Sequence, residues 1–349
     1  MPHRSEQLPR RPSTEASSPP EQEPEFEVSV FLSGHDTAAD IERLKPLLAQ
    51  ADVYVPEAYG HDGEHTIALY DEIMSDPGIA ALGEMGIDLP TAQLQEAVWL
   101  AGQPKVIMLA DVPRNSREYG YLEQSDHLVR ELLVRATHEF YQGNTQAAVQ
   151  LASEAYDFAA EAIERHNNFM RKSVQAQLPD LIARHPELAD KHPLRILMTL
   201  GLAHTDVGQP MGEQITTKKY YGNSLNIFSQ HDEIIRRKMK HLPVSEHLYV
   251  QTIIEACLLE QTDALLDQLP TVNERSLARR LLLEQITPAM IPPLEQRLRA
   301  QRKPDEMGET IIAVLTAQGV QIPRTFQELQ TLLDSYPYRG RMNRSATAE

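Results

Sequence analysis

The chain has 349 residues, enough for one large α/β domain or for one domain with a helical appendage. It carries 33 Lys and Arg against 50 Asp and Glu, and the resulting net charge of −17 disfavours nucleic acid and anionic membranes as partners. Its single cysteine, Cys257, excludes an intramolecular disulfide and a cysteine-based zinc cluster, and it lies in an apolar helical run where we expect a core residue.

No segment approaches the roughly 20 consecutive apolar residues of a membrane helix, and the N-terminal segment has no apolar core of the kind found in secretory signals. We therefore expect a soluble, cytoplasmic protein. Residues 1–24 are rich in Pro, Ser, Glu and Arg, a composition typical of a disordered segment.

The ordered part is expected to start with a strand over 26–32, which ends at Gly34-His35-Asp36. A helix over 38–51 follows, with one apolar stripe and with Pro46 expected to kink or split it. A second strand starts at Asp52 and ends at Glu57. After a polar loop, the apolar spacing predicts helices over 66–75 and 91–101.

A nearly continuous apolar run over 105–110 indicates a strand buried in a parallel sheet, and it ends at Asp111-Val-Pro-Arg114. Helical spacing then predicts one helix to about Gln142 and a long one from an Asn144 or Thr145 cap toward Gln177. A fourth buried strand covers 194–203 and ends at His204, and 207–215 is expected to form a short helix.

The remainder of the chain, 231–336, is predicted to be helical, and 337–349 is a frayed tail. The expected helices cover 245–269, 274–285, 293–302, 307–318 and 325–335. Strands that alternate with helices predict an α/β fold with a mainly parallel sheet covered by helices. The expected organisation is a disordered segment over 1–24, an α/β domain over 25–230, a helical region over 231–336 and a disordered tail.

Ionisable residues follow each of the four predicted strands. They are His35, Glu57, Asp111 with Arg114, and His204. Because ligand sites of parallel sheets form at the carboxyl ends of the strands, we expect these side chains to share one site.

Two chemistries fit this set of residues. His35, Glu57 and His204 would hold a divalent metal such as Mn, Co or Zn with an open position for water, whose pKa the metal lowers. Without a metal, His35 or His204 would act as a general base oriented by Glu57. In both cases Arg114 would bind an oxyanion or a substrate carboxylate. Asp111 would have a supporting role in the same pocket.

Other histidines are expected to be less informative. His61 and His65 lie in a polar loop that is expected to be solvated, and His138 and His166 lie on helical patterns as surface or packing residues. The chain has no phosphate-binding glycine motif, no nucleophile elbow and no H-E-x-x-H helix, which excludes the commonest nucleotide-binding and serine-hydrolase classes.

The order of the motifs over residues 26–210 resembles the TraB/TIKI, ChaN-like and erythromycin-esterase-like superfamily. The matching pieces are Ser33-Gly-His35-Asp-Thr, Ala51-Asp-Val-Tyr-Val-Pro-Glu57, Lys105-Val-Ile-Met-Leu-Ala-Asp111-Val-Pro-Arg114 and Gly201-Leu-Ala-His204. Gly34 and His35 are adjacent, where the superfamily usually spaces them by two residues, and Val112-Pro113 splits the Asp-Arg pair. The resemblance implies metal-dependent peptide cleavage, ester hydrolysis through a histidine base, or haem-iron handling, with His35, Glu57 and His204 as central residues.

Two hypotheses follow. The first is a hydrolase that acts on a peptide or ester bond through an activated water at the pocket of His35, Glu57, Asp111, Arg114 and His204. The second is a non-catalytic binding protein that uses the same fold and docks a partner protein through its C-terminal helices.

Overall fold

The computed structural model describes residues 26–33, 38–79, 96, 98–103, 105–222, 227–301 and 306–337. The predicted N-terminal segment, nearly all of the predicted C-terminal tail and most of the predicted helix over 91–101 lie outside these residues. The turn after the first strand, which contains His35, also lies outside them.

The described residues form a five-stranded sheet in which every pair of neighbouring strands is parallel, in the order β3-β2-β4-β1-β5. The strands are β1 (Phe26–Ser33), β2 (Val53–Val55), β3 (Val106–Ile107), β4 (Leu194–Gly201) and β5 (Ile215–Tyr221). The α/β fold and the parallel sheet are confirmed, and all four predicted strands are present, although β3 covers only Val106–Ile107 of the predicted 105–110. The fifth strand, β5, was not predicted, because its Thr and Lys residues give no apolar pattern and it lies at the edge of the sheet.

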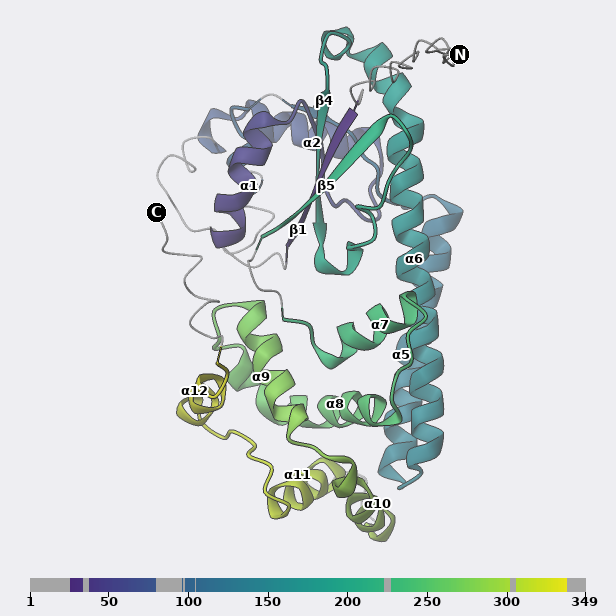
Figure 1. Ribbon diagram of the computed structural model, residues 1–349, viewed down its shortest axis with the longest axis vertical. Helices are drawn as coiled ribbons and strands as arrows, with labels where there is room; N and C mark the ends of the chain where they lie inside the picture. The colour runs from purple at the N-terminus through teal and green to yellow at the C-terminus, as the bar shows by residue number, and fades with distance from the viewer. Residues whose placement is uncertain are drawn as a thin grey trace, which may run out of the picture.

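Helices cover both faces of the sheet (Figure 1). On one face, α1 (Ala38–Gln50) and α2 (Glu64–Ser75) pack against Phe31, Tyr54 and Leu197. On the other face, α6 (Thr145–Arg184) packs against a set of strand residues that includes Val28, Val30, Leu32, Ile196 and Met198. Residues of opposite faces alternate along β1 and β4, as the pleat of a strand requires.

A pair of antiparallel helices links this α/β half to a helical half. Ser116 caps α5 (Arg117–Tyr141) by accepting a 3.0 Å hydrogen bond from the backbone of Tyr119, and Gly143 makes the turn into α6. The 40 residues of α6 run on through Pro179, beyond the predicted end near Gln177, and span about 60 Å. Its C-terminal part covers the sheet, while its N-terminal part packs in the helical half (Figure 1).

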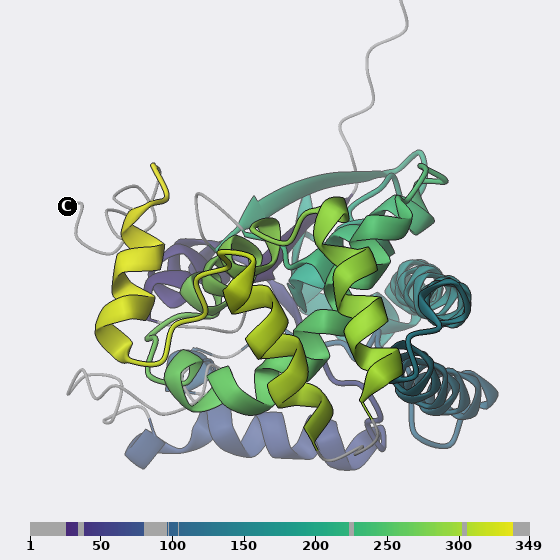
Figure 2. The ribbon, with the colours of Figure 1, turned by 90° about the horizontal axis from the view of Figure 1, so that it is seen from below.

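The helical half contains α7 (Gln230–Met239), α8 (Glu246–Leu266), α9 (Val272–Glu284), α10 (Ile291–Ala300), α11 (Met307–Ala317) and α12 (Phe326–Asp334). The five helices predicted between 245 and 335 are confirmed to within a few residues at each end, whereas α7 was not predicted as a separate helix. Figure 2, which shows the molecule from below, places α5 and α6 end-on beside these helices.

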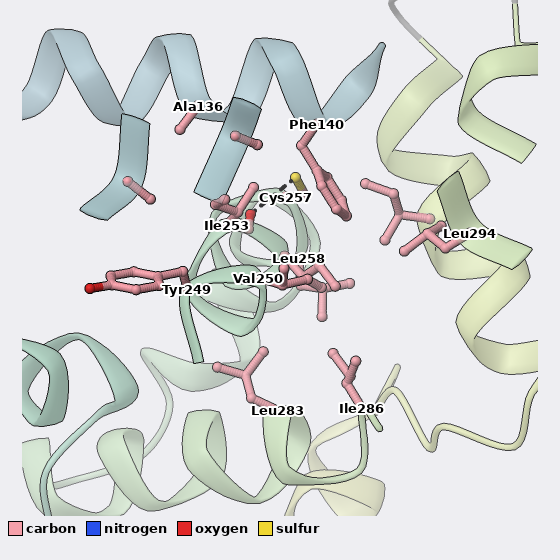
Figure 3. Close-up of a cluster of buried hydrophobic side chains, with 14 of the residues drawn as sticks. Ala136, Phe140, Tyr249, Val250, Ile253, Cys257, Leu258, Leu283, Ile286 and Leu294 are labelled. Carbon is pink, nitrogen blue, oxygen red and sulfur yellow. Dashed lines mark hydrogen bonds between the residues drawn. The ribbon is translucent and has the colours of Figure 1, made fainter. Parts of the chain in front are cut away.

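The core of the helical half is built around α8 (Figure 3). Phe140 of α5 and Leu294 of α10 both approach α8, and both are completely buried. Cys257 is buried among these residues and donates a 3.3 Å hydrogen bond to the carbonyl of Ile253, which confirms it as a core residue. The cluster also contains residues of α5 and α6, so the two halves share these helices.

Two local expectations were wrong. Residues 207–215 form turns that lead into β5 rather than a helix, since Gly208, Pro210 and Gly212 interrupt the apolar spacing. Pro46 was expected to kink or split α1, and the split is wrong, because α1 is one helix from Ala38 to Gln50. Within the part of the chain that the structure describes, no helix has the length and apolar character needed to span a membrane.

Candidate active site

The carboxyl ends of β1 and β4 form a topological switch point of the sheet. The two strands are neighbours, and Ser33 at the end of β1 pairs with Gly201 at the end of β4. The segment that follows β4 packs on the α6 face through Val207 and Met211, whereas α1, which follows β1, packs on the opposite face. In open α/β sheets, ligands bind outside the strand ends at such a point.

His204 lies just beyond β4, in the short helical turn Leu202–His204, and only 7% of its surface is exposed. Its Nδ1 lies 2.7 Å from Oδ1 of Asn167 on α6. Because a carboxamide oxygen can only accept a hydrogen bond, Nδ1 carries the proton. The basic nitrogen of the neutral ring is then Nε2, which lies 3.7 Å from Oε1 of Glu57.

Glu57 follows β2 and is half-buried. Its Oε2 accepts a 2.7 Å hydrogen bond from the backbone N–H of Gly201, which ties the end of β2 to the end of β4. Its Oε1 is the atom near His204. The backbone bond therefore sets the orientation in which the carboxylate meets the imidazole.

Asp111 follows β3 and is almost completely buried. Its carboxylate accepts hydrogen bonds from the backbone of Ala58 (3.1 Å) and of Val112 (2.7 Å), and it forms a 2.5 Å contact with Nε2 of His166 on α6. The ring of His166 packs edge-to-face on the ring of His204, with 4.8 Å between the centroids. Two histidine–carboxylate pairs therefore lie side by side at the strand ends.

The other predicted residues are placed differently. The side chain of Arg114 is exposed, and no contact joins it to Glu57, Asp111 or His204 in the described part of the chain. The backbone N–H of Arg114 donates a 3.0 Å hydrogen bond to the carbonyl of His61. His35 lies outside the described residues.

His61 belongs to the wall of the site, so the expectation of a solvated loop was wrong for it. Its Nδ1 accepts a hydrogen bond from the N–H of Gly63 (3.1 Å), so Nε2 carries the proton and donates to the backbone carbonyl of Asp111 (3.0 Å). His61 and Asp111 also line a neighbouring pocket of about 310 Å³, together with Phe169 and Gln177 of α6.

Tyr59 covers His166 from the outside. Its ring is tilted on the imidazole of His166 at 5.4 Å and stacks on Tyr119 at 5.0 Å. Partial burial raises the pKa of the Tyr59 hydroxyl well above its usual value, and a 3.0 Å hydrogen bond to Glu123 raises it further. The phenol is therefore protonated near neutral pH, and it is a packing and donor group rather than a base.

Sequence reasoning missed His166 and Asn167. His166 was expected to be a surface or packing residue, as His138 is, but it contacts Asp111 instead. One signal was present: Asn167 falls in the apolar stripe of α6 with Met170 and Val174, and a polar residue in a buried stripe needs a partner.

Asn167 also provides an unused donor. The residue is 1% exposed, and its Nδ2 is buried without a hydrogen-bond partner among the described residues. A buried amide without a partner costs about 1–3 kcal/mol, so such an atom indicates a water or ligand oxygen that completes the site.

The predicted metal set is only partly described. Glu57 and His204 come together, whereas the third predicted ligand, His35, lies outside the described residues. Within the described ranges, no three His, Cys, Asp or Glu residues are arranged to hold a metal ion. Comparison with protein-family models, with curated proteins and with solved structures finds no match to this chain.

Proposed function

We propose that this protein is a hydrolase that activates a water molecule at the switch point of its sheet, with His204 as the general base. The observation that carries the proposal is the orientation of His204. Asn167 holds its Nδ1–H, and the basic Nε2 lies on the side of Glu57. A histidine fixed in one tautomer has one defined basic nitrogen, which a general base needs, and a carboxylate near that nitrogen favours the protonated ring.

The proton transfer is simple to describe. His204 Nε2 takes a proton from water as the oxygen attacks an ester or peptide carbonyl, and the imidazolium that forms is stabilised by the negative charge of Glu57 at 3.7 Å. The pair of Asp111 and His166 holds α6 against the strand ends, which keeps Asn167 in place.

A metal-assisted form of the same hydrolysis would use Glu57 and His204 with His35, the set implied by the resemblance to the TraB/TIKI and ChaN-like superfamily. A divalent Mn, Co or Zn ion bound there would supply a water of lowered pKa. In that form Glu57 and His204 act as ligands, and Asn167 still orients His204 through Nδ1, as second-sphere partners of metal-bound histidines do.

A non-catalytic binding protein is the second candidate. The burial of the residues around His204 favours it. Asn167, Asp111 and His204 are all less than a tenth exposed, so the network also serves to fasten α6 to the sheet. In this reading the site contributes stability, and the C-terminal helices contact a partner protein.

The test compares His204→Gln and Glu57→Gln with the wild-type protein on a panel of aryl esters and peptides. Gln retains hydrogen-bonding capacity for Asn167, whereas Ala at position 204 would leave the Asn167 oxygen buried without a partner. The matched control is His138→Gln, a histidine exposed on α5. We expect both site variants to lower kcat/KM by about 100-fold or more with little change in melting temperature, and the control to have no effect.

Three results would argue against this proposal. Undiminished turnover in His204→Gln would remove His204 as the base. A wild-type protein that hydrolyses nothing in the panel, with or without added Mn, Co or Zn, would favour the binding protein. Stoichiometric metal in the purified protein that is lost in His35→Gln and His204→Gln would replace the histidine-base form by the metal-assisted one.

A further inference from the structure

A second pocket lies in the helical half, away from the strand ends. It measures about 450 Å³, within the usual range for small-molecule sites, and five different helices or their caps contribute to it. The lining residues used below are Leu133, Tyr156, His231, Asp232, Glu255, Ala256 and Arg279. None of them belongs to the site proposed above.

Acidic groups outnumber basic ones around this pocket. Glu255 of α8 lies in its wall and is 9% exposed, and its carboxylate is 4.0 Å from Nε of Arg279, longer than a hydrogen bond. The guanidinium of Arg279 also lies 3.5 Å from Asp263, so two carboxylates share its charge. Asp232, which closes the capping box of α7 with Ser229, adds a further negative charge.

Aromatic and apolar side chains form the rest of the wall. Tyr156 of α6 packs edge-on against His231 of α7, with 5.1 Å between the ring centroids and 3.1 Å between the hydroxyl and Nδ1. Leu133 of α5 and Ala256 of α8 add apolar surface. Aromatic rings beside carboxylates make a favourable environment for an organic cation, which gains from both.

We propose that this pocket binds a small organic ammonium compound, with Glu255 as its counter-ion and Tyr156 and His231 as its aromatic wall. The ammonium group would lie at Glu255, on the side that also faces Asp232, and the hydrocarbon part would lie against Leu133 and Ala256. A ligand carboxylate is disfavoured, because it would meet the negative charges of Glu255 and Asp232.

Burial raises the pKa of the Glu255 carboxyl to about 7, an effect that Arg279 opposes and that Asp232 and Asp263 reinforce. Of the groups that face the pocket, Tyr156 has its pKa raised by burial and His231 has its pKa lowered by desolvation. Glu255 therefore changes its charge between pH 6 and pH 8, while an aliphatic ammonium stays charged throughout.

The experiment measures binding to the full-length protein by calorimetry, with phenethylamine, putrescine and choline as cations. The probes 2-phenylethanol and 3-phenylpropanoate serve as the neutral and anionic analogues of the first. We expect at least one cation to bind with a stoichiometry of one, and neither analogue to bind comparably. Because binding requires the ionised carboxylate, affinity should be about tenfold weaker at pH 6 than at pH 8.

Two variants and a control complete the design. Glu255→Gln should weaken cation binding at pH 8 at least tenfold and abolish its pH dependence, and Ala256→Phe should block the pocket while it leaves Glu255 in place. Glu309→Gln, at an exposed position of α11, should bind as the wild-type protein does. The proposal is overturned if no cation binds, if the carboxylate binds more tightly than the amine, or if Glu255→Gln binds with wild-type affinity.

Discussion

Replacing Glu255 by Gln should make the protein more stable at alkaline pH. Burial raises the pKa of this carboxyl from its ordinary value of 4.5 to about 7. The folded protein therefore holds a proton that the unfolded chain releases between these two values. Stability consequently falls as pH rises from about 4.5 to about 7, and the full penalty is present above pH 7.

The magnitude follows from the two pKa values. The difference between 4.5 and about 7 corresponds to a loss of about 3 kcal/mol in the free energy of unfolding above pH 7. At pH 5 the loss is less than about 1 kcal/mol. Gln has a similar shape and no charge, so it avoids the penalty at every pH. Arg279 retains Asp263 as an ion-pair partner in the variant.

The assay is urea unfolding of the wild-type protein and of Glu255→Gln at pH 5 and at pH 8, with Glu309→Gln as the control. The variant should be about 3 kcal/mol more stable than the wild-type protein at pH 8 and nearly equal to it at pH 5, while the control should follow the wild-type protein at both. A variant that is less stable at pH 8, or that differs from the wild type by the same amount at both pH values, would refute the reasoning.

Two further predictions concern the core and the turn between the long helices. Phe140→Ala removes a completely buried ring and should lower the free energy of unfolding in urea by about 3–5 kcal/mol. Val134 is 70% exposed on the same helix, so Val134→Ala should change it by no more than about 0.5 kcal/mol. Equal losses in the two variants would contradict the assignment of the core around α8. Gly143→Ala should lower the melting temperature more than Gly319→Ala. Both glycines have positive φ, so both substitutions strain the backbone. Only at Gly143 would the added Cβ also come within 2.9 Å of a backbone oxygen, that of Glu295.

The sequence determined much of the architecture. Apolar runs bounded by Gly or Pro predicted four strands of the sheet, and the spacing of apolar residues predicted α5, α6 and α8 with small errors at their ends. These patterns are local, because a strand or helix must bury the residues that lie on one face. The polar residue that ends each run was also readable, and two of those residues, Glu57 and His204, lie within 3.7 Å of each other.

Only the tertiary structure decided which residues surround Glu57 and His204. His166 and Asn167 reach the strand ends because α6 crosses the sheet in one particular register, which no spacing along the chain specifies. Arg114 follows a strand as predicted, but its side chain is exposed, which its place after the strand did not indicate.

The pocket around Glu255 shows the same limit more strongly. Tyr156, His231, Glu255 and Arg279 come from four helices spread over more than a hundred residues of sequence, and each alone fits an ordinary helical pattern. Local periodicity tells which face of a helix is buried, whereas the neighbour that it is buried against depends on how the helices pack. The sequence therefore determined the elements and their apolar faces, and packing decided which charges and rings meet.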